Sequence, residues 1–422
     1  QLGADVDPQA SDDELGNSVS LSSDGLRVAI GAPYNDDDYT DAGLVKLYDW
    51  NGTNWIQAGD DIYGEAIGDR SGWSVSLSGD GSTVAIGAPL NDGTGSDAGH
   101  VRLFEWNAST SNWDMFGEID GEATGDESGT SVSLSNDGSR VAIGAPYNDG
   151  ADETNSKRGH VRVHKWDGAS WTQVGSDIDG DAAGDQSGYS VSLSGNGLTV
   201  AVGAPRNDDA FADAGQVKLY EWDTTGSELG WVQLSTAIKG GAVDDKSGSS
   251  VSLSSDGTTV AIGSPYFSDG GSKVYAGQVN VYKWDGAAWT QVGADIDGDA
   301  EDLLGFSVSL SSDGTTVAIG GPNNREDINY AGHVRVYELI GATWTQVSAD
   351  INGEAGGDES GRSVSLSGDG SRVAIGAPYN DDGGDSAGQV RLYDRSGIAW
   401  IQVGVDIDGD AAGNEFGSSV AL

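Results

Sequence analysis

The sequence predicts an all-β protein, a seven-bladed β-propeller of four-stranded antiparallel blades. Three observations predict this fold: an internal repeat, alternating strands inside each repeat, and small residues along one face of those strands. The repeat is followed at the first serine of Ser-Val-Ser-Leu, which recurs every 56 to 60 residues at Ser18, Ser74, Ser131, Ser190, Ser250, Ser307 and Ser363, with a truncated copy at Ser419. Such a period is typical of propellers and solenoids.

The third repeat shows the strands of one blade. A first strand at Ser131–Ser135 and a second at Arg140–Gly144 flank Asn136-Asp137-Gly138, and Asp-Gly is a strong hairpin signal. A third strand follows at His160–Trp166, and a fourth, Trp-Thr-Gln-Val-Gly-Ser-Asp-Ile, starts at Trp171. An acidic, glycine-rich connection then leads into the next repeat. The sequence therefore predicts a four-stranded meander in every repeat.

Both faces of this meander are expected to be buried. Val and Leu alternate toward one face, while Ser, Ala and Gly line the other, where a solvated sheet would show charged residues. Small residues favour close packing of a neighbouring sheet, as in a propeller. Tryptophan recurs at hairpin positions, which indicates core packing rather than a sugar-binding stripe: Trp55, Trp113, Trp171, Trp231, Trp289, Trp344 and Trp400 in the fourth strand, and Trp50, Trp106, Trp166, Trp222 and Trp284 in the third.

The repeats are expected to form one domain, residues 1–422, from units of about 57 residues. The ends overlap: Gln1–Val6 resembles a fourth strand, as does Gln402–Ile407, and Ser418–Leu422 repeats the first strand. One terminal strand is expected to complete a blade begun at the other end, leaving the spare copy for contact with a neighbouring molecule. A segment of a longer array of repeats is the alternative.

Charge and composition exclude several partners. The net charge is −46, so binding to nucleic acid is disfavoured by the sign of the long-range field. No apolar run approaches the roughly 20 residues of a membrane helix, which argues against membrane insertion. Cysteine is absent, which excludes disulfides and thiolate metal sites. Such acidity is common in proteins of salt water, and solubility alone would also explain it.

The units resemble the FG-GAP repeat family, whose best-known members form the propeller of integrin α-chain heads. The resemblance lies in Gly-Ala-Pro at Gly31–Pro33, Gly87–Pro89, Gly144–Pro146, Gly203–Pro205 and Gly376–Pro378, its variants at Gly263–Pro265 and Gly320–Pro322, and Phe416-Gly417. It implies a propeller and an extracellular setting. In the integrin-type repeat, calcium lies in an Asp-rich loop between strands 1 and 2. Here that connection is a short Asp-Gly turn, so calcium is not carried over to it.

Candidate ligand-binding residues lie in the loops between the second and third strands. These 2–3 loops differ in sequence while the strands do not, and they share one edge with the acidic connections between the fourth strand and the next first strand. Together the 2–3 loops and 4–1 connections are called the acidic rim. The predicted binding residues are Tyr34, Asn35, Asp36, Asn91, Asp92, Tyr147, Asn148, Asp149, Asn207, Asp208, Tyr379, Asn380 and Asp381.

The 4–1 connections also carry a candidate cation site. Asp177, Asp179, Asp181 and Asp185 fall at positions 1, 3, 5 and 9, and the first three positions recur at Asp295, Asp297 and Asp299 and at Asp406, Asp408 and Asp410. Oxygen ligands at this spacing suit calcium, the one cofactor that the sequence suggests. The glycine placement departs from that of an EF-hand loop, and no glutamate closes it. An acidic outer strand that discourages edge pairing is the alternative.

The sequence gives little support for catalysis. His100, His160 and His333 share a third-strand position that Gln216, Gln278 and Gln389 fill in other repeats, so these histidines are expected to be structural. No local motif assembles a Ser-His-Asp or Cys-His set. The favoured interpretation is an extracellular or cell-surface adhesion module that binds a protein or glycan partner through its acidic rim and is not an enzyme. The alternatives are a subunit of a surface layer or filament and a polysaccharide-active enzyme.

Overall fold

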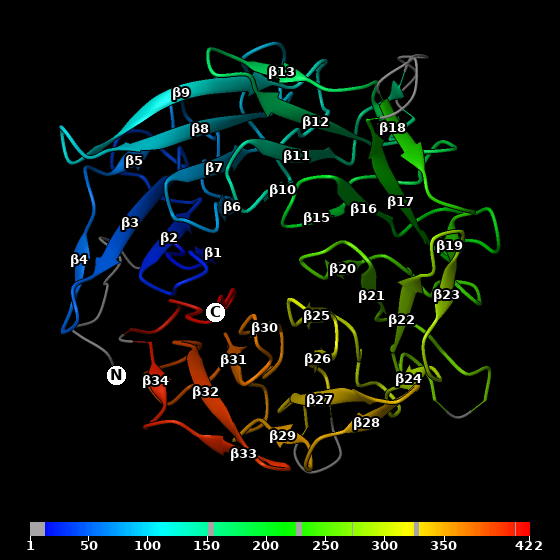
Figure 1. Ribbon diagram of the computed structural model, residues 1–422. Coiled ribbons are helices and arrows are strands. Elements are labelled where there is room, and N and C mark those ends of the chain that lie inside the picture. The colour runs from blue at the N-terminus through cyan, green and yellow to red at the C-terminus, as the bar shows by residue number, and fades with distance from the viewer. Residues whose placement is uncertain (1–12, 151–155, 225–229, 272, 325–328, 410) are drawn as a thin grey trace. The chain divides into compact units, whose positions relative to one another are not determined.

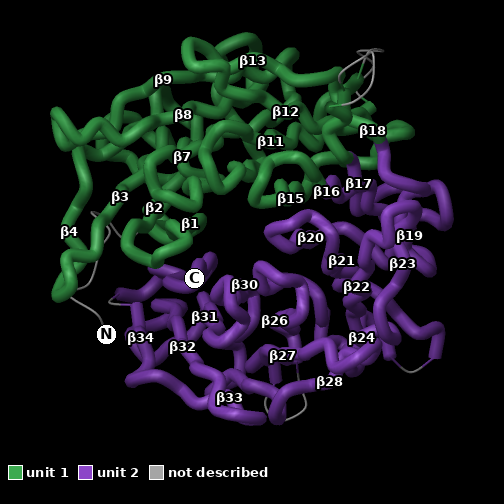
Figure 2. Tube along the Cα trace, in the orientation of Figure 1, with its two compact units in different colours: residues 1–200, 221–232 green, residues 201–220, 233–422 purple. Residues whose placement is uncertain are grey.

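The computed structural model describes residues 13–150, 156–224, 230–271, 273–324, 329–409 and 411–422. Its regular structure is entirely β, arranged as seven consecutive antiparallel sheets, and the fold is the predicted seven-bladed β-propeller (Figure 1). The described residues contain no helix that is long and apolar enough to cross a membrane. They divide into two compact units, residues 1–200 with 221–232 and residues 201–220 with 233–422, coloured in Figure 2. The division runs through the fourth sheet, and each unit is described by itself.

Each sheet starts with two strands joined by the short turn that the sequence predicts. The first strands are β1 (Ser18–Leu21), β6 (Ser74–Leu77), β10 (Ser131–Leu134), β15 (Ser190–Leu193), β20 (Ser250–Leu253), β25 (Ser307–Leu310) and β30 (Ser363–Leu366). The second strands are β2 (Arg27–Ala32), β7 (Thr83–Ala88), β11 (Arg140–Ala145), β16 (Thr199–Ala204), β21 (Thr259–Ser264), β26 (Thr316–Gly321) and β31 (Arg372–Ala377).

The third strand is central to each sheet because it pairs with the second strand and with every piece of the fourth. The third strands are β3 (Leu44–Trp50), β8 (His100–Asn107), β12 (His160–Trp166), β17 (Gln216–Asp223), β22 (Gln278–Trp284), β27 (His333–Ile340) and β32 (Gln389–Ser396).

The fourth strand differs from the prediction, because six sheets split it into two pieces. The first pieces are β4 (Trp55–Gln57), β13 (Trp171–Gln173), β18 (Gly230–Gln233), β23 (Trp289–Gln291), β28 (Thr343–Gln346) and β33 (Ala399–Gln402). The second pieces are β5 (Ile62–Tyr63), β14 (Ile178–Asp179), β19 (Ile238–Lys239), β24 (Ile296–Asp297), β29 (Ile351–Asn352) and β34 (Ile407–Asp408).

Chain length at the break explains the split. In the third sheet, four residues separate Gln173 from Ile178, and Gly175 takes a φ of 78°, which only glycine adopts without cost. The second sheet has one residue fewer at this point and keeps a continuous β9 (Asn112–Asp120), with a single irregularity opposite Leu103 and Phe104. The extra residue therefore converts a bulge into a break.

Both faces of a sheet are buried against neighbouring sheets, as predicted. In the first unit, Val84 and Ile86 of β7 pack with residues of the first sheet, whereas Ala85 between them packs with Val141 and Ile143 of the third. The large face of one sheet therefore meets the small face of the sheet before it. The second unit repeats this packing between its fifth, sixth and seventh sheets.

The tryptophans pack in the core, as predicted. Cross-strand partners lie close together, with ring centroids 5.5 Å apart for Trp106 and Trp113. Trp113 is buried, and its indole N–H donates to the Ala58 carbonyl of the preceding sheet. Trp231 and Trp344 make the same bond one sheet back, to Val174 and Val292.

The Gly-Ala-Pro motif marks the closest contact between sheets. A Cβ added to Gly144 would lie 2.1 Å from the carbonyl oxygen of Gly188, which opens the next repeat. The Ser131 hydroxyl donates to that same carbonyl at 2.8 Å. One serine further along, the Ser133 hydroxyl accepts the Leu193 N–H at 3.0 Å. These contacts explain why glycine and serine recur in every repeat.

The predictions for the two ends of the chain compare differently with the structure. The predicted strand at Gln1–Val6 lies outside the described residues. Ser418–Leu422 is described and forms no strand, but the Leu422 N–H donates to Ser365, as Leu310 and Leu366 do to the serine one repeat earlier. The C-terminal segment therefore holds the contact of a first strand without its hairpin. The single domain over residues 1–422 and the completion of a blade by a terminal strand stay predictions.

Substitution of Gly144 by alanine tests the close contact. We expect Gly144→Ala to lower the free energy of unfolding by about 3 kcal/mol or more, because its Cβ would meet backbone rather than a flexible side chain. Gly241→Ala is the control, since its Cβ would meet only the Asp245 carboxylate at 3.6 Å. Denaturant unfolding of both variants would measure the difference. Equal losses would show that the contact does not constrain the fold.

Candidate functional site

The acidic rim is held together by the asparagines of its 2–3 loops. The Asn91 amide donates to the buried Asp69 carboxylate of the preceding 4–1 connection at 3.0 Å, and Asn148 bonds to Asp126 in the same way. The asparagine oxygen accepts an N–H two residues further on, which is an Asx-turn. All five asparagines predicted to bind a ligand are buried: Asn35, Asn91, Asn148, Asn207 and Asn380. They therefore support the loops from within.

The other predicted rim residues are more accessible. Asp36, Asp92, Asp208 and Asp381 are exposed, and Asp149 is half-buried. Each of these carboxylates also accepts an N–H later in its own loop, such as Asp97 N–H to Asp92 at 2.9 Å. Tyr34, Tyr147 and Tyr379 are half-buried. The side chains that a partner can reach are thus aspartates and tyrosines.

Two positions beside the loops vary from repeat to repeat and were not predicted. One directly precedes the first strand, where Trp73, Thr130, Tyr189, Phe306 and Arg362 occur in different repeats. The other lies three residues earlier and has positive φ, at Arg70, Glu127, Gln186, Lys246 and Glu359 among others. The signal was present in the sequence as variation at fixed places in an otherwise regular repeat.

Cations and aromatic rings at these positions stack on one another. The Arg70 guanidinium lies 4.7 Å from the ring centroid of Tyr34 and 5.8 Å from that of Trp73. Lys157 approaches Tyr147 at 4.9 Å in the first unit, and in the second unit Arg362 lies 5.5 Å from Tyr379. These contacts favour one orientation of the half-buried rings.

A hollow of about 360 Å³ lies among these residues in the first unit. Its walls combine aromatic rings with one cation and one carboxylate: Arg70, Trp73, Pro89, Leu90, Glu127, Thr130, Tyr147 and Tyr189. Burial raises the pKa of the Glu127 carboxyl, and Asp97 adds to the rise, while Lys157 and Arg70 oppose it. Tyr147 is the only one of these residues that the sequence singled out as a ligand-binding residue.

The carboxylates of the 4–1 connections have different environments. Asp185 is buried and accepts the N–H groups of Asp181 and Ala182, so it closes its own loop. Asp126, Asp245, Asp302 and Asp358 occupy the equivalent place in other repeats. Asp177 accepts from Gln173 and forms a close group with Glu122 and His160, while Asp179 and Asp181 are exposed.

In the second unit the equivalent aspartates bond to neighbouring side chains. Asp295 accepts from Gln291 and Asn280, Asp297 from Gln278, and Asp299 from Arg335. In the seventh repeat Asp406 accepts from Gln402 and Asp408 from Gln389, while Asp410 lies outside the described residues. Calcium binding at these connections stays a prediction.

In five repeats the third strand carries a buried cation: Lys46, Arg102, Arg162, Arg335 and Arg391. The Arg102 guanidinium donates to the Tyr63 carbonyl at 2.6 Å and to the Ser71 hydroxyl at 3.0 Å, both in the preceding 4–1 region. The Arg162 and Arg391 guanidinium groups donate in the same way to the backbone carbonyls of Asp120 and Asn352. The histidines lie two residues earlier in the strand, and His100, His160 and His333 are all buried.

Comparison with known proteins agrees with this fold. The FG-GAP repeat family matches residues 64–104, 171–220 and 349–393, so the chain carries FG-GAP repeats, as the motifs indicated. None of the curated proteins compared with the chain matches it.

Solved structures show the same fold at low identity. A Bacteroides fragilis protein proposed to be a 6-phosphogluconolactonase has a TM-score of 0.56 and 11% identity, over 96% of this chain and 98% of its own. The Pseudomonas aeruginosa periplasmic gluconolactonase PpgL gives 0.54 and 15%, over 87% and 93%. Saccharomyces cerevisiae Sqt1 gives 0.53 and 12%, over 92% and 84%. At these identities the likeness shows the fold alone.

Buried histidine makes stability depend on pH. Burial lowers the pKa of His164 to about 4, and Arg162 adds to the effect while Asp177 opposes it. Since the unfolded value is about 6.5, the folded protein binds fewer protons below that pH, and stability falls as pH decreases from 6.5 toward 4. We expect this residue to cost about 2 kcal/mol between pH 7 and pH 5.

His164→Phe isolates the effect, because Phe104 fills the same place in the second sheet. The free energy of unfolding of wild type should fall relative to that of the variant as pH decreases from 7 to 5. Parallel pH profiles would contradict the expectation.

Proposed function

We propose that this protein is an extracellular or cell-surface adhesion module that binds a protein or glycan partner through its acidic rim. The support comes from the division of labour within each repeat. Buried asparagine, aspartate and arginine side chains fix the loops. The positions next to them, most of which are half-buried, change from one repeat to the next, which is the usual arrangement of a binding surface on a rigid scaffold.

The hollow in the first unit is the single observation that carries the proposal. Trp73, Tyr147 and Tyr189 offer flat apolar rings, and Arg70 and Glu127 offer a donor and an acceptor. A concave site with aromatic walls and a few charged groups suits a small ligand group such as a sugar ring or a protruding side chain of a protein partner. The many exposed carboxylates around it favour a partner with cationic or hydroxyl groups.

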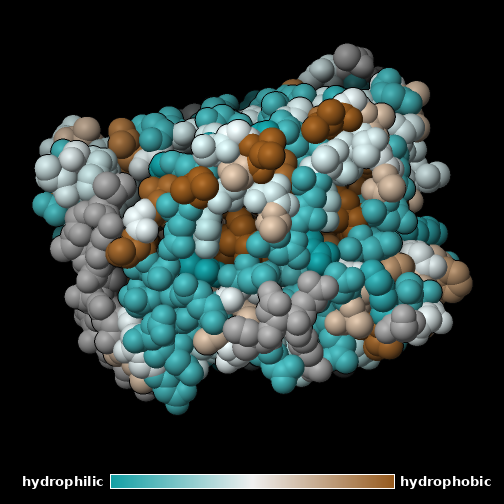
Figure 3. Space-filling model, turned by 90° about the horizontal axis from the view of Figure 1, so that it is seen from below, coloured by the Kyte–Doolittle hydropathy of each residue, from teal (hydrophilic) through white to brown (hydrophobic). Residues whose placement is uncertain are grey.

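The molecular surface supports display to solvent. Hydrophilic residues are spread across the face in Figure 3, and hydrophobic residues form separate patches among them. The net charge of −46 keeps such a surface soluble. Calcium at the 4–1 connections is part of the proposal as an aid to partner binding, so binding is to be measured with and without calcium.

The proposal contains no catalytic step, although proteins of similar fold are named gluconolactonases. The walls of the hollow include no histidine or serine that could act as base and nucleophile. We therefore expect no hydrolysis of 6-phosphogluconolactone. Turnover of that lactone or of a charged polysaccharide would replace the binding proposal by an enzymatic one.

Binding to a glycan array and to cell surfaces tests the proposal. Trp73→Ala and Tyr147→Ala should each weaken binding about tenfold or more, since truncated aromatic anchors commonly cost this much. Ile398→Ala is the control, because Ile398 is an exposed apolar residue outside the rim, in the hairpin between β32 and β33. Unchanged binding in both rim variants would refute the role of the hollow. Ordered oligomers as the sole interaction would favour the surface-layer alternative.

A further inference from the structure

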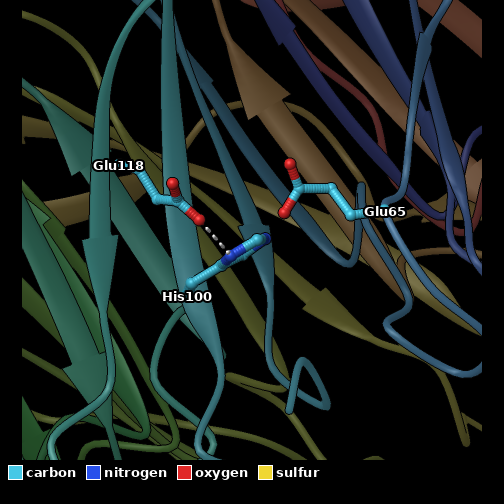
Figure 4. Close-up of side chains that lie close together, drawn as sticks. All are labelled: Glu65, His100 and Glu118. Atoms are coloured by element: carbon cyan, nitrogen blue, oxygen red, sulfur yellow. Dashed lines mark ion pairs between the residues drawn. The ribbon is translucent and has the colours of Figure 1, made fainter. Parts of the chain in front are cut away.

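A buried imidazole stands among carboxylates where the first and second sheets meet. His100, the first residue of β8, is 1% exposed, and neither of its ring nitrogens has a hydrogen-bond partner. Glu118 of β9 and Glu65, which follows β5, flank it in Figure 4. The His100 Nδ1 lies 3.3 Å from a Glu118 oxygen, and the three nearest ligand atoms all lie within 4.8 Å of one another. A buried polar group without a partner is costly and calls for one.

A similar group of one histidine and two carboxylates occurs one repeat later. His160 opens β12 and is also 1% exposed. Its Nδ1 lies 3.9 Å from a Glu122 oxygen, and the ring nitrogen without a hydrogen-bond partner is Nε2. Glu122 and Asp177 complete a second group whose ligand atoms lie within 4.8 Å. These are the only two such three-residue groups among the residues that the structure describes. Their matching places in successive repeats indicate a shared cause.

The carboxylates around His100 carry more negative charge than the nearby guanidinium neutralises, which favours binding of a cation. Arg102 approaches Glu65 at 3.7 Å, but its shorter bonds go to the Tyr63 carbonyl and the Ser71 hydroxyl. One guanidinium therefore faces two carboxylates. Burial raises the pKa of Glu118, and the neighbouring Glu65 and Asp120 carboxylates add to the rise. Burial lowers the pKa of His100 to about 3, so its imidazole is neutral at neutral pH and keeps a free lone pair.

We propose that Glu65, His100 and Glu118 bind a first-row transition-metal dication, with Zn²⁺ as the representative ion, and that Glu122, His160 and Asp177 bind a second. Imidazole nitrogen and carboxylate oxygen are both ligands that zinc accepts, and three protein ligands leave a fourth position for water. The 3.3 Å between His100 Nδ1 and Glu118 is about the separation of two ligands that share a tetrahedral zinc ion. Calcium prefers six or more oxygens, so this ion differs from the calcium suggested by the sequence.

In the sixth repeat, the histidine at the start of the third strand, His333, has carboxylates nearby that do not form a ligand set. Asp350 and Asp302 approach opposite ring nitrogens of His333, at 3.5 Å and 3.8 Å, so they do not converge on one point. Both carboxylates also lie near Arg335, at 2.9 Å and 3.8 Å. His333 is therefore a matched control, equally buried and at the same place in the repeat.

Metal titration of the full chain tests the proposal. Chelator-treated protein is titrated with Zn²⁺ by calorimetry, and with Co²⁺ by visible absorption, which reports nitrogen and oxygen ligation directly. The variants are His100→Gln, His160→Gln and His333→Gln. Glutamine already fills this position at Gln216, Gln278 and Gln389, so the variants are expected to fold. Glu118→Gln removes one carboxylate and keeps the imidazole.

Wild type and His333→Gln should bind two Zn²⁺ per chain, in keeping with the two groups, and His100→Gln and His160→Gln should each bind one. Glu118→Gln should weaken one site about tenfold or more. Absence of Zn²⁺ binding to wild type would overturn the proposal. So would equal stoichiometry in all variants, which would show adsorption to exposed carboxylates. None of these side chains lines the hollow, so either outcome leaves the proposed binding function to its own test.

Discussion

The structure depends on the close approach of successive sheets along their first and second strands. At each described junction within a unit, a glycine of the Gly-Ala-Pro motif faces the carbonyl of the glycine that opens the next repeat, and no side chain fits between them. A serine hydroxyl bonds to that carbonyl, and a second serine accepts the next leucine N–H. The small face of a sheet is therefore a set of fixed contacts, and it allows the large Val, Ile and Leu face of the following sheet to fill the space.

The acidic rim inherits its geometry from this packing. In four repeats the 2–3 loop is bonded through its asparagine to a buried aspartate of the preceding 4–1 connection, at Asn91, Asn148, Asn324 and Asn380. The same aspartate closes its own 4–1 connection by accepting backbone N–H groups. The buried asparagines and aspartates fix the rim backbone, and residues such as Trp73 and Arg70 project from it. Variation at these positions changes the surface without changing the scaffold, which is the physical basis for the binding function that we propose.

The junctions between sheets also collect charge. Third-strand arginines reach carbonyls of the preceding sheet, and histidines stand beside them with exposed carboxylates at the edge. A buried charge is tolerated only where such partners are present. The same places therefore combine structural ion pairs with the buried imidazoles from which we infer metal binding. The difference between His100 and His333 depends on where the neighbouring carboxylates lie, because both ring nitrogens of each lack a hydrogen-bond partner.

The sequence by itself determined the fold class, the repeat boundaries and the burial of the tryptophans. These follow from alternating residues, turn residues and a repeat period, and the same pattern recurs in every repeat. It also located the acidic rim. Tertiary structure decided which rim residues a ligand can reach: Asn91 and Asn148 are drawn inside by aspartates 22 residues earlier in the chain. It likewise decided that Asp177 meets Glu122 and His160 as well as Gln173, four residues before it. Contacts between sheets join residues from different repeats, and the spacing within one repeat does not contain them.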